Sequence, residues 1–167
     1  MLWRRRVVAV LAALVALSVP GLAGCGGGSP TTTVGPTGNQ PPLKAAEATV
    51  RSHGYFPVDV SAYDAKASLA AIVAVRKGSA DATAQRAFFF ADGRFAGTDT
   101  AKDSSGIRVA FARPPVIGLT YALYAARDPQ CCPTDGATTV RYRWNGKRVV
   151  PLEPIPPSSF SVGKSRR

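Results

Sequence analysis

The stretch FFFADGRFA, residues 88–96, carries the clearest structural signal in the chain. The Asp-Gly pair at 92–93 suits the two positive-φ positions of a type I′ turn, which joins two antiparallel strands through a two-residue loop. In that register Phe90 faces Phe95, and Phe88 lies on the same side of the hairpin. We therefore predict a hairpin whose three phenylalanines form part of a hydrophobic core.

Two more strands are predicted on the C-terminal side of this hairpin. Residues 107–111 and 117–123 alternate apolar side chains with polar or small ones. This period of two is typical of an antiparallel strand with one face on the core and the other in water. In the first strand it places Ile107, Val109 and Phe111 on the core face. The two consecutive prolines between the segments cannot donate to a ladder and mark the connection.

The stretch VRYRWNGKRVV, residues 140–150, predicts another hairpin, because Asn-Gly at 145–146 again fits a two-residue turn. This register sets Arg143 opposite Arg148 and Tyr142 opposite Val149. One face then collects Val140, Tyr142, Trp144 and Val149. The other face collects Arg141, Arg143 and Arg148.

We interpret this arginine face as a candidate site for an anion or a partner. Like charges directly opposed on a sheet repel each other, and an anionic ligand between Arg143 and Arg148 would relieve that repulsion. Arginine also presents a planar fork that suits phosphate or carboxylate. The alternative is that the guanidinium groups of all three arginines, including Arg141, extend into water with no ligand.

The N-terminal part of the domain predicts a helix. Residues 43–53 follow two prolines and precede Gly54, and Leu43, Ala46 and Val50 repeat at helical spacing. The stripe is modest, so we expect the helix to pack on a sheet. Its last residue is the only histidine of the chain, which the helix dipole favours in its protonated form. We interpret that histidine, His53, as a cap and not as a catalytic group.

The expected fold class is α+β, with a short N-terminal helix packed on one antiparallel sheet of about five to seven strands. Residues 67–77 are ambiguous by pattern, and their β-branched run before Gly78 favours a buried strand. Residues 43–157 are predicted to form a single globular domain. Residues 158–167 are predicted to be a disordered basic tail.

The N-terminus has the composition of an export signal. A run of arginines precedes an apolar segment at 7–19 that is too short to span a bilayer. The sequence LAGC at 22–25 then looks like the lipobox of bacterial lipoproteins, in which the cysteine is lipidated and becomes the mature N-terminus. We predict a signal peptide at 1–24 and a lipidated Cys25 leading a flexible Gly/Ser/Thr/Pro tether at 25–42. The alternative is an ordinary signal peptide with an incidental cysteine.

With Cys25 assigned to lipid, Cys131 and Cys132 are left as adjacent partners in an oxidising compartment. A vicinal disulfide between them is one prediction. A reduced pair, a mixed disulfide and an intermolecular bridge are the alternatives. Neighbouring Cα atoms lie closer than is usual for disulfides, so such a bridge would be easily reduced.

Composition limits the classes of function. Removing Arg4, Arg5 and Arg6 from 21 basic residues leaves 18 against 10 acidic ones, a net charge of +8. Such an excess suits anionic partners, and export disfavours nucleic acid as a partner because an exported lipoprotein does not normally meet it. The chain shows no nucleophile matched with a base, no metal-ligand spacing and no phosphate loop, so we expect no enzyme, no metal and no cofactor. Asp99 and Asp103 flank a polar loop and are expected to be solvated.

Three segments together resemble the LppP/LprE lipoprotein family of actinobacteria: FFFADGRFAGTDT at 88–100, CCP at 131–133 and VRYRWNGKRVVPLEPIPP at 140–157. The resemblance covers roughly residues 43–157. It implies a small lipoprotein anchored by lipid on the extracytoplasmic face of the cell membrane, and it carries over no activity.

Taken together, these features predict a membrane-anchored envelope lipoprotein that is not an enzyme and that binds an anionic envelope component or a protein partner. The alternative is a thiol/disulfide redox-sensitive envelope protein that uses Cys131 and Cys132.

Overall fold

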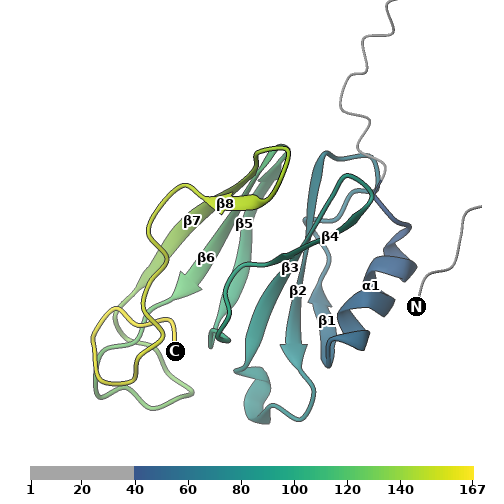
Figure 1. Cartoon of the computed structure of the whole chain (residues 1–167). Helices are drawn as coiled ribbons and strands as arrows, with labels where there is room; N and C mark the ends of the chain where they lie inside the picture. Colours follow the sequence, from purple (N-terminus) through teal and green to yellow (C-terminus); the bar gives the residue numbers. More distant parts are fainter. Residues whose placement is uncertain (1–39) are drawn as a thin grey trace, which may run out of the picture. The chain divides into compact units, whose positions relative to one another are not determined.

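The computed structural model describes residues 40–167, so the predicted signal peptide, the predicted lipidation site Cys25 and residues 25–39 of the predicted tether lie outside the described residues. Residues 40–42 are described and do not match a flexible tether, because Gln40 is buried and its side-chain amide donates to the carbonyl of Ala67 at 2.8 Å. The described part begins with one α-helix and a four-stranded antiparallel sheet, called sheet A (Figure 1). These elements are α1 (Leu43–Ser52), β1 (Tyr55–Asp59), β2 (Leu69–Arg76), β3 (Gln85–Ala91) and β4 (Arg94–Thr98). A 3-10 turn, η1 (Ala80–Ala82), lies in the loop between β2 and β3.

The second half of the described chain forms another four-stranded antiparallel sheet, called sheet B. Its strands are β5 (Ile107–Arg113), β6 (Val116–Ala122), β7 (Ala137–Trp144) and β8 (Val149–Pro151). Both sheets have their strands in chain order, so each is a simple meander. No helix within residues 40–167 has the length and apolar character needed to cross a membrane.

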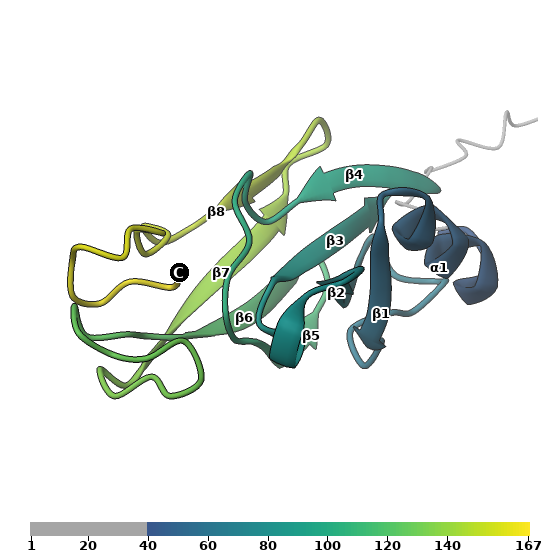
Figure 2. The same ribbon diagram turned by 90° about the horizontal axis from the view of Figure 1, so that it is seen from below.

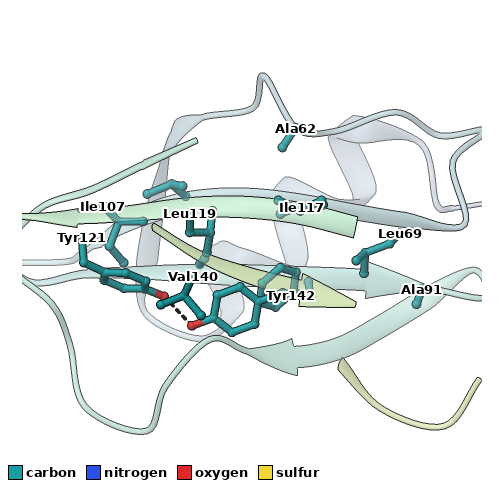
Figure 3. Close-up of a cluster of buried hydrophobic side chains, with 13 residues drawn as sticks. Ala62, Leu69, Ala91, Ile107, Ile117, Leu119, Tyr121, Val140 and Tyr142 are labelled. Carbon is teal, nitrogen blue, oxygen red and sulfur yellow. Dashed lines mark hydrogen bonds between the residues drawn. The ribbon is translucent and has the colours of Figure 1, made fainter. Parts of the chain in front are cut away.

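The two sheets pack face to face over one apolar core (Figures 1 and 2). Sheet A contributes Leu69, Ala71, Val73, Ala87, Phe89 and Ala91, and sheet B contributes Ile107, Ile117, Leu119, Tyr121, Val140 and Tyr142. Figure 3 shows the side chains of this core. The opposite face of sheet A forms a second cluster that includes Ala46 and Val50 of α1 with Ile72, Phe88 and Phe90.

The structure corrects the prediction of one sheet. β2 is buried from Leu69 to Val75, on both of its faces, because sheet B covers one face and the second cluster covers the other. A strand buried on both faces needs a layer on each side. Residues 40–167 are therefore mostly β, with two sheets and one short helix.

Several local predictions are confirmed. The helix ends at Ser52, with His53 as its C-terminal cap and Gly54 at φ +81°. Residues 92 and 93 both have positive φ, 50° and 76°, as a type I′ turn requires. Phe90 pairs with Phe95, and Phe88 lies in the same cluster.

The register of the last hairpin differs from its prediction by two residues. Trp144 pairs with Val149 and Arg143 pairs with Val150, so Arg143 does not face Arg148. The turn spans four residues because the Asn145 side chain accepts hydrogen bonds from the backbone N–H groups of residues 147 and 148, at 3.0 and 2.9 Å. A four-residue turn held by the Asn145 side chain therefore takes the place of the predicted two-residue turn.

Residues 158–167 do not match the prediction of a disordered tail. Ser165 forms an antiparallel bridge with Tyr124, and both Figures 1 and 2 show the C-terminal segment beside the loop that follows β6. Arg166 is buried, and its Nη1 donates to the carbonyl oxygens of Lys102 and Asp103 and to the hydroxyl of Ser104 at 2.7–3.1 Å. These bonds hold the tail against the domain.

Candidate anion-binding surface

The outer face of sheet B, which points away from sheet A, consists of rows of paired residues. One row contains Arg113, Val116, Arg143 and Val150. The next row contains Phe111, Gly118 and Arg141, and the row after it contains Arg108, Thr120 and Thr139. The structure thus brings arginines of β5 and β7 onto one face.

A bulge in β5 decides which side chains join this face. The pairing with β6 shifts between Val109 and Phe111, so Phe111 lies opposite Gly118 on the outer face. The prediction that Phe111 faces the core is therefore wrong. A bulge adds one residue to one strand and reverses the faces of every residue after it. The same shift turns Arg113 outward.

The Phe111 ring covers the outer surface of Gly118. A Cβ atom on Gly118 would overlap atoms of that ring, and only a glycine at this position avoids the overlap. The guanidinium of Arg113 lies 5.8 Å from the centroid of the same ring, within cation–π range. The half-buried Phe111 ring, which lies over Gly118, therefore helps to set the direction of Arg113.

Arg141 is not available as a free cation. Its Nε donates to Glu153 Oε1 at 2.6 Å, and its backbone N–H donates to Glu153 Oε2 at 2.6 Å. The hydrogen bonds from Arg141 hold the pKa of the Glu153 carboxyl below its ordinary value, with the charge of Arg141 acting in the same direction. Of the three arginines predicted as a site, Arg141 is thus neutralised by its neighbour in the extended segment after β8.

The other two predicted arginines are exposed. Arg143 lies beside Val116 on the outer face, and Arg148 lies in the hairpin loop. Within residues 40–167, neither they nor Arg113 form an ion pair. The hairpin loop lies close to the β5–β6 connection, because the backbone N–H of Trp144 donates to the carbonyl of Pro115 at 3.3 Å. Arg113, Arg143 and Arg148, here called the basic end, gather at this end of sheet B.

Sequence reasoning missed Arg113 because the predicted strand ended at residue 111, and because the same alternation continued past that residue would have placed Arg113 on the core face. The signal that could have found it is Gly118 on the neighbouring strand, since a glycine inside a strand often marks a bulge or a close approach.

The cysteine pair lies away from the basic end. Cys131 lines a shallow pocket of about 400 Å³ together with Arg108, Thr120 and Ala137, at the other end of sheet B. Both cysteines are exposed, their Cα atoms are 3.8 Å apart, and their sulfur atoms are within bonding distance of each other. The structure does not bring them to the edge of the arginine face.

Asp128 organises the loop that carries the cysteines. Its carboxylate accepts hydrogen bonds from the backbone N–H groups of Ala125 and Thr134, both at 2.7 Å, and from the Thr134 hydroxyl at 2.7 Å. Partial desolvation acts to raise the pKa of this carboxyl, but these hydrogen bonds outweigh it and the pKa is lowered from its ordinary value. The loop therefore has a fixed anchor at neutral pH.

The two loop carboxylates expected to be solvated are both engaged. Asp99 is 7% exposed, accepts a hydrogen bond from Tyr121 at 2.8 Å, and has its pKa raised to about 6 by burial. Asp103 accepts a hydrogen bond from Tyr55 at 2.6 Å and lies 2.7 Å from Arg86 and 3.3 Å from Arg76. Within residues 40–167, no group of three or more His, Cys, Asp or Glu side chains is placed to hold a metal ion.

The architecture defined by residues 40–167 is a two-sheet β domain with a basic outer face. The family of LppP/LprE lipoproteins matches residues 61–147, which include most of both sheets and the cysteine pair. The chain belongs to this family. No match to the chain was found among curated proteins or among solved structures. Membership of a lipoprotein family indicates a membrane-associated envelope protein.

Proposed function

We propose that this lipoprotein is a non-enzymatic binding module, anchored through Cys25 on the extracytoplasmic face of the cell membrane, that binds an anionic envelope component through the basic end of sheet B. The observation that carries the proposal is the row in which Arg113 and Arg143 flank Val116 without a carboxylate partner. Two guanidinium groups held on a rigid sheet form a preorganised contact for phosphate or carboxylate oxygens.

The location of the basic end supports binding to an extended anionic surface. Arg113 belongs to β5, and Arg143 belongs to β7, which is separated from β5 by β6. Arg148 lies in the loop after β7, at the same end of the sheet. Their side chains are exposed, and they line neither the groove of about 930 Å³ nor the pocket of about 400 Å³ found among the described residues. An open basic face suits lipid head groups or an anionic polymer, and its affinity is expected to fall as salt rises.

The test dilutes the full chain from detergent micelles to below the critical micelle concentration and measures its binding to vesicles of anionic and of zwitterionic phospholipid, and to an anionic wall polymer, at low and high salt. We expect Arg113→Gln, Arg143→Gln and Arg148→Gln together to remove the salt-sensitive binding. The matched control is Lys44→Gln, Arg51→Gln and Lys66→Gln, which removes the same charge from residues in and near α1. An equal loss in both variants would indicate a net-charge effect and would contradict the proposal.

A redox-sensitive role is the second candidate, favoured by the exposure of Cys131 and Cys132 and by the position of their sulfur atoms. A role of this kind requires that the pair change between dithiol and disulfide in the native compartment. Intact mass before and after alkylation without reductant measures that state. Protein taken from the envelope under both oxidising and reducing conditions should then show two different masses.

A further inference from the structure

A groove of about 930 Å³ lies on a part of the domain that the proposed function does not use. It opens where the loop after β2, the loop at 101–105 and the C-terminal segment meet. Four cationic side chains line it: Arg76, Arg86, Lys102 and Arg167. The same lining contains one carboxylate, Asp103.

Asp103 cannot neutralise the groove. It is shared by two guanidinium groups, those of Arg76 and Arg86, and it also accepts a hydrogen bond from Tyr55. Burial and the hydrogen bond to Asp103 raise the pKa of Tyr55 to about 12, so this phenol stays a donor at neutral pH. The lining side chains therefore keep an excess of positive charge.

Two of the cations are held in place and each has a donor to spare. Arg86 donates to the carbonyl of Ala101 at 2.8 Å, and its guanidinium lies 5.3 Å from the centroid of the Tyr55 ring. Arg167 lies between the rings of Tyr124 and Phe160, at 4.9 and 5.2 Å from their centroids. The Nε atoms of both arginines are buried and have no hydrogen-bond acceptor among the described residues. A buried donor without a partner is uncommon in folded proteins, and strain, a functional role or a bound water or ion accounts for such donors.

The loop that forms one wall of the groove has a strained backbone. Asp81 and Ala82, both non-glycine residues, have φ of 53° and 54°. The neighbouring Ser79 hydroxyl accepts a hydrogen bond from the N–H of Ala84 at 2.9 Å and fixes the loop. Left-handed conformations at non-glycine residues cost about 1–3 kcal/mol each and concentrate at ligand-binding sites.

The rim of the groove offers contacts for a sugar-sized group. Phe160 is 62% exposed, so much of its ring is open to a ligand. The Ser105 oxygen accepts a hydrogen bond from the Gln130 amide, which leaves its own proton free to donate. The volume lies within the range of sites that enclose small organic molecules and exceeds what a single phosphate needs.

We propose that this groove binds a phosphorylated sugar. The phosphate lies among Arg76, Arg86 and Lys102, where its two negative charges offset the excess positive charge. The sugar lies toward Phe160, whose ring contacts the apolar face of the sugar. The site is separate from the basic end of sheet B, and its occupancy does not depend on the membrane surface.

The test is calorimetric titration of the full chain in detergent micelles with glucose 6-phosphate, inorganic phosphate and glucose. We expect saturable binding of glucose 6-phosphate that is stronger than that of phosphate, and no binding of glucose. Arg76→Gln with Lys102→Gln should weaken the binding of glucose 6-phosphate about tenfold or more, because two charged contacts are lost. Both side chains are exposed, so the fold should survive; an unchanged unfolding midpoint verifies this.

Two further variants make the result specific. Phe160→Ala should weaken the binding of glucose 6-phosphate severalfold and leave that of phosphate unchanged. Arg143→Gln with Arg148→Gln, at the basic end, should change neither. The proposal is overturned if glucose 6-phosphate does not bind, if it binds no better than phosphate, or if the groove pair and the basic-end pair weaken it equally. Failure of vesicle binding with intact sugar-phosphate binding would instead contradict only the proposed function.

Discussion

The hydroxyl oxygens of Tyr121 and Tyr142 lie 2.7 Å apart between the two sheets, where Figure 3 shows the two rings converging. Tyr121 donates its proton to the carboxylate of Asp99 at 2.8 Å, so Tyr142 is the donor to Tyr121. Asp99 also accepts a hydrogen bond of 3.0 Å from the backbone N–H of Ala87 in β3. A polar chain thus crosses the apolar core and links sheet A to sheet B.

This arrangement makes stability depend on pH. Burial raises the pKa of Asp99 from 3.8 to about 6, so the folded state holds a proton more tightly than the unfolded state. The stability that the protonated Asp99 contributes is therefore fully present below about pH 4 and is lost between about pH 4 and 6. Above about pH 6 the free energy of unfolding no longer changes through this group. The size of the loss is at most about 3 kcal/mol, at 1.36 kcal/mol for each pKa unit.

Asp99→Asn should remove this dependence. The amide of the variant donates to Tyr121, which then donates to Tyr142, so the chain is kept without a buried charge. We expect the variant to be more stable than the native protein at pH 7.5 and similar to it at pH 4, as measured by urea unfolding. Asp92→Asn, in the exposed hairpin turn, is the control. A constant difference between Asp99→Asn and the native protein across this pH range would contradict the prediction.

Gly118→Ala tests the close approach on the outer face of sheet B. The new methyl group would overlap the Phe111 ring, and the ring must leave its place over β6. We expect a loss of about 1–3 kcal/mol in urea unfolding, the usual cost of overpacking. In a protein that already carries Phe111→Ala, Gly118→Ala should lower the free energy of unfolding much less. Additive effects of the two substitutions would show that the ring does not constrain Gly118.

Arg166→Ala should release the C-terminal segment. The substitution removes every hydrogen bond from the Arg166 side chain to the loop at 102–104 and the bond from its Nε to the carbonyl of Pro156. Buried acceptors then lose their donors, and we expect a loss of about 3 kcal/mol. Cleavage by trypsin after Lys164 should become faster, as followed by mass spectrometry. Arg127→Ala, at an exposed position, should leave both readouts unchanged.

Glu153→Gln should strengthen the binding of anionic vesicles. The change frees the charge of Arg141, which its carboxylate partner now neutralises. The cost in stability should be small, because the ion pair is exposed to solvent. Glu47→Gln frees Arg51 on α1 in the same way and is the matched control. Equal gains in vesicle binding would show that net charge alone decides affinity.

Replacing Cys131 and Cys132 by serine should change the free energy of unfolding little. A bridge between neighbours closes almost no loop, so the entropy it removes from the unfolded chain is worth about 1 kcal/mol or less. The measurement is urea unfolding of the full chain with and without reductant. A loss of several kcal/mol would indicate that the bridge shapes the loop held by Asp128.

Local signals in the sequence were sufficient for the elements whose geometry is local. Asp92-Gly93 fits its turn by intrinsic conformational preference, and the helix is bounded by prolines and Gly54. The pairing of Phe90 with Phe95 then follows from the turn alone. The family resemblance could also be recognised from the sequence, because it depends on the identity of individual residues.

Only the tertiary structure decided the faces and the sites. The bulge in β5 reversed the faces of Phe111 and Arg113, and a side-chain hydrogen bond lengthened the Asn145 turn. Glu153 neutralised Arg141, and the C-terminal segment built a wall of the groove through Arg167. These outcomes depend on which distant groups compete for the same hydrogen bond or the same space. The sequence determines which turns, strands and hydrogen bonds each residue can form. The packing of distant segments determines which of these are formed in the folded protein.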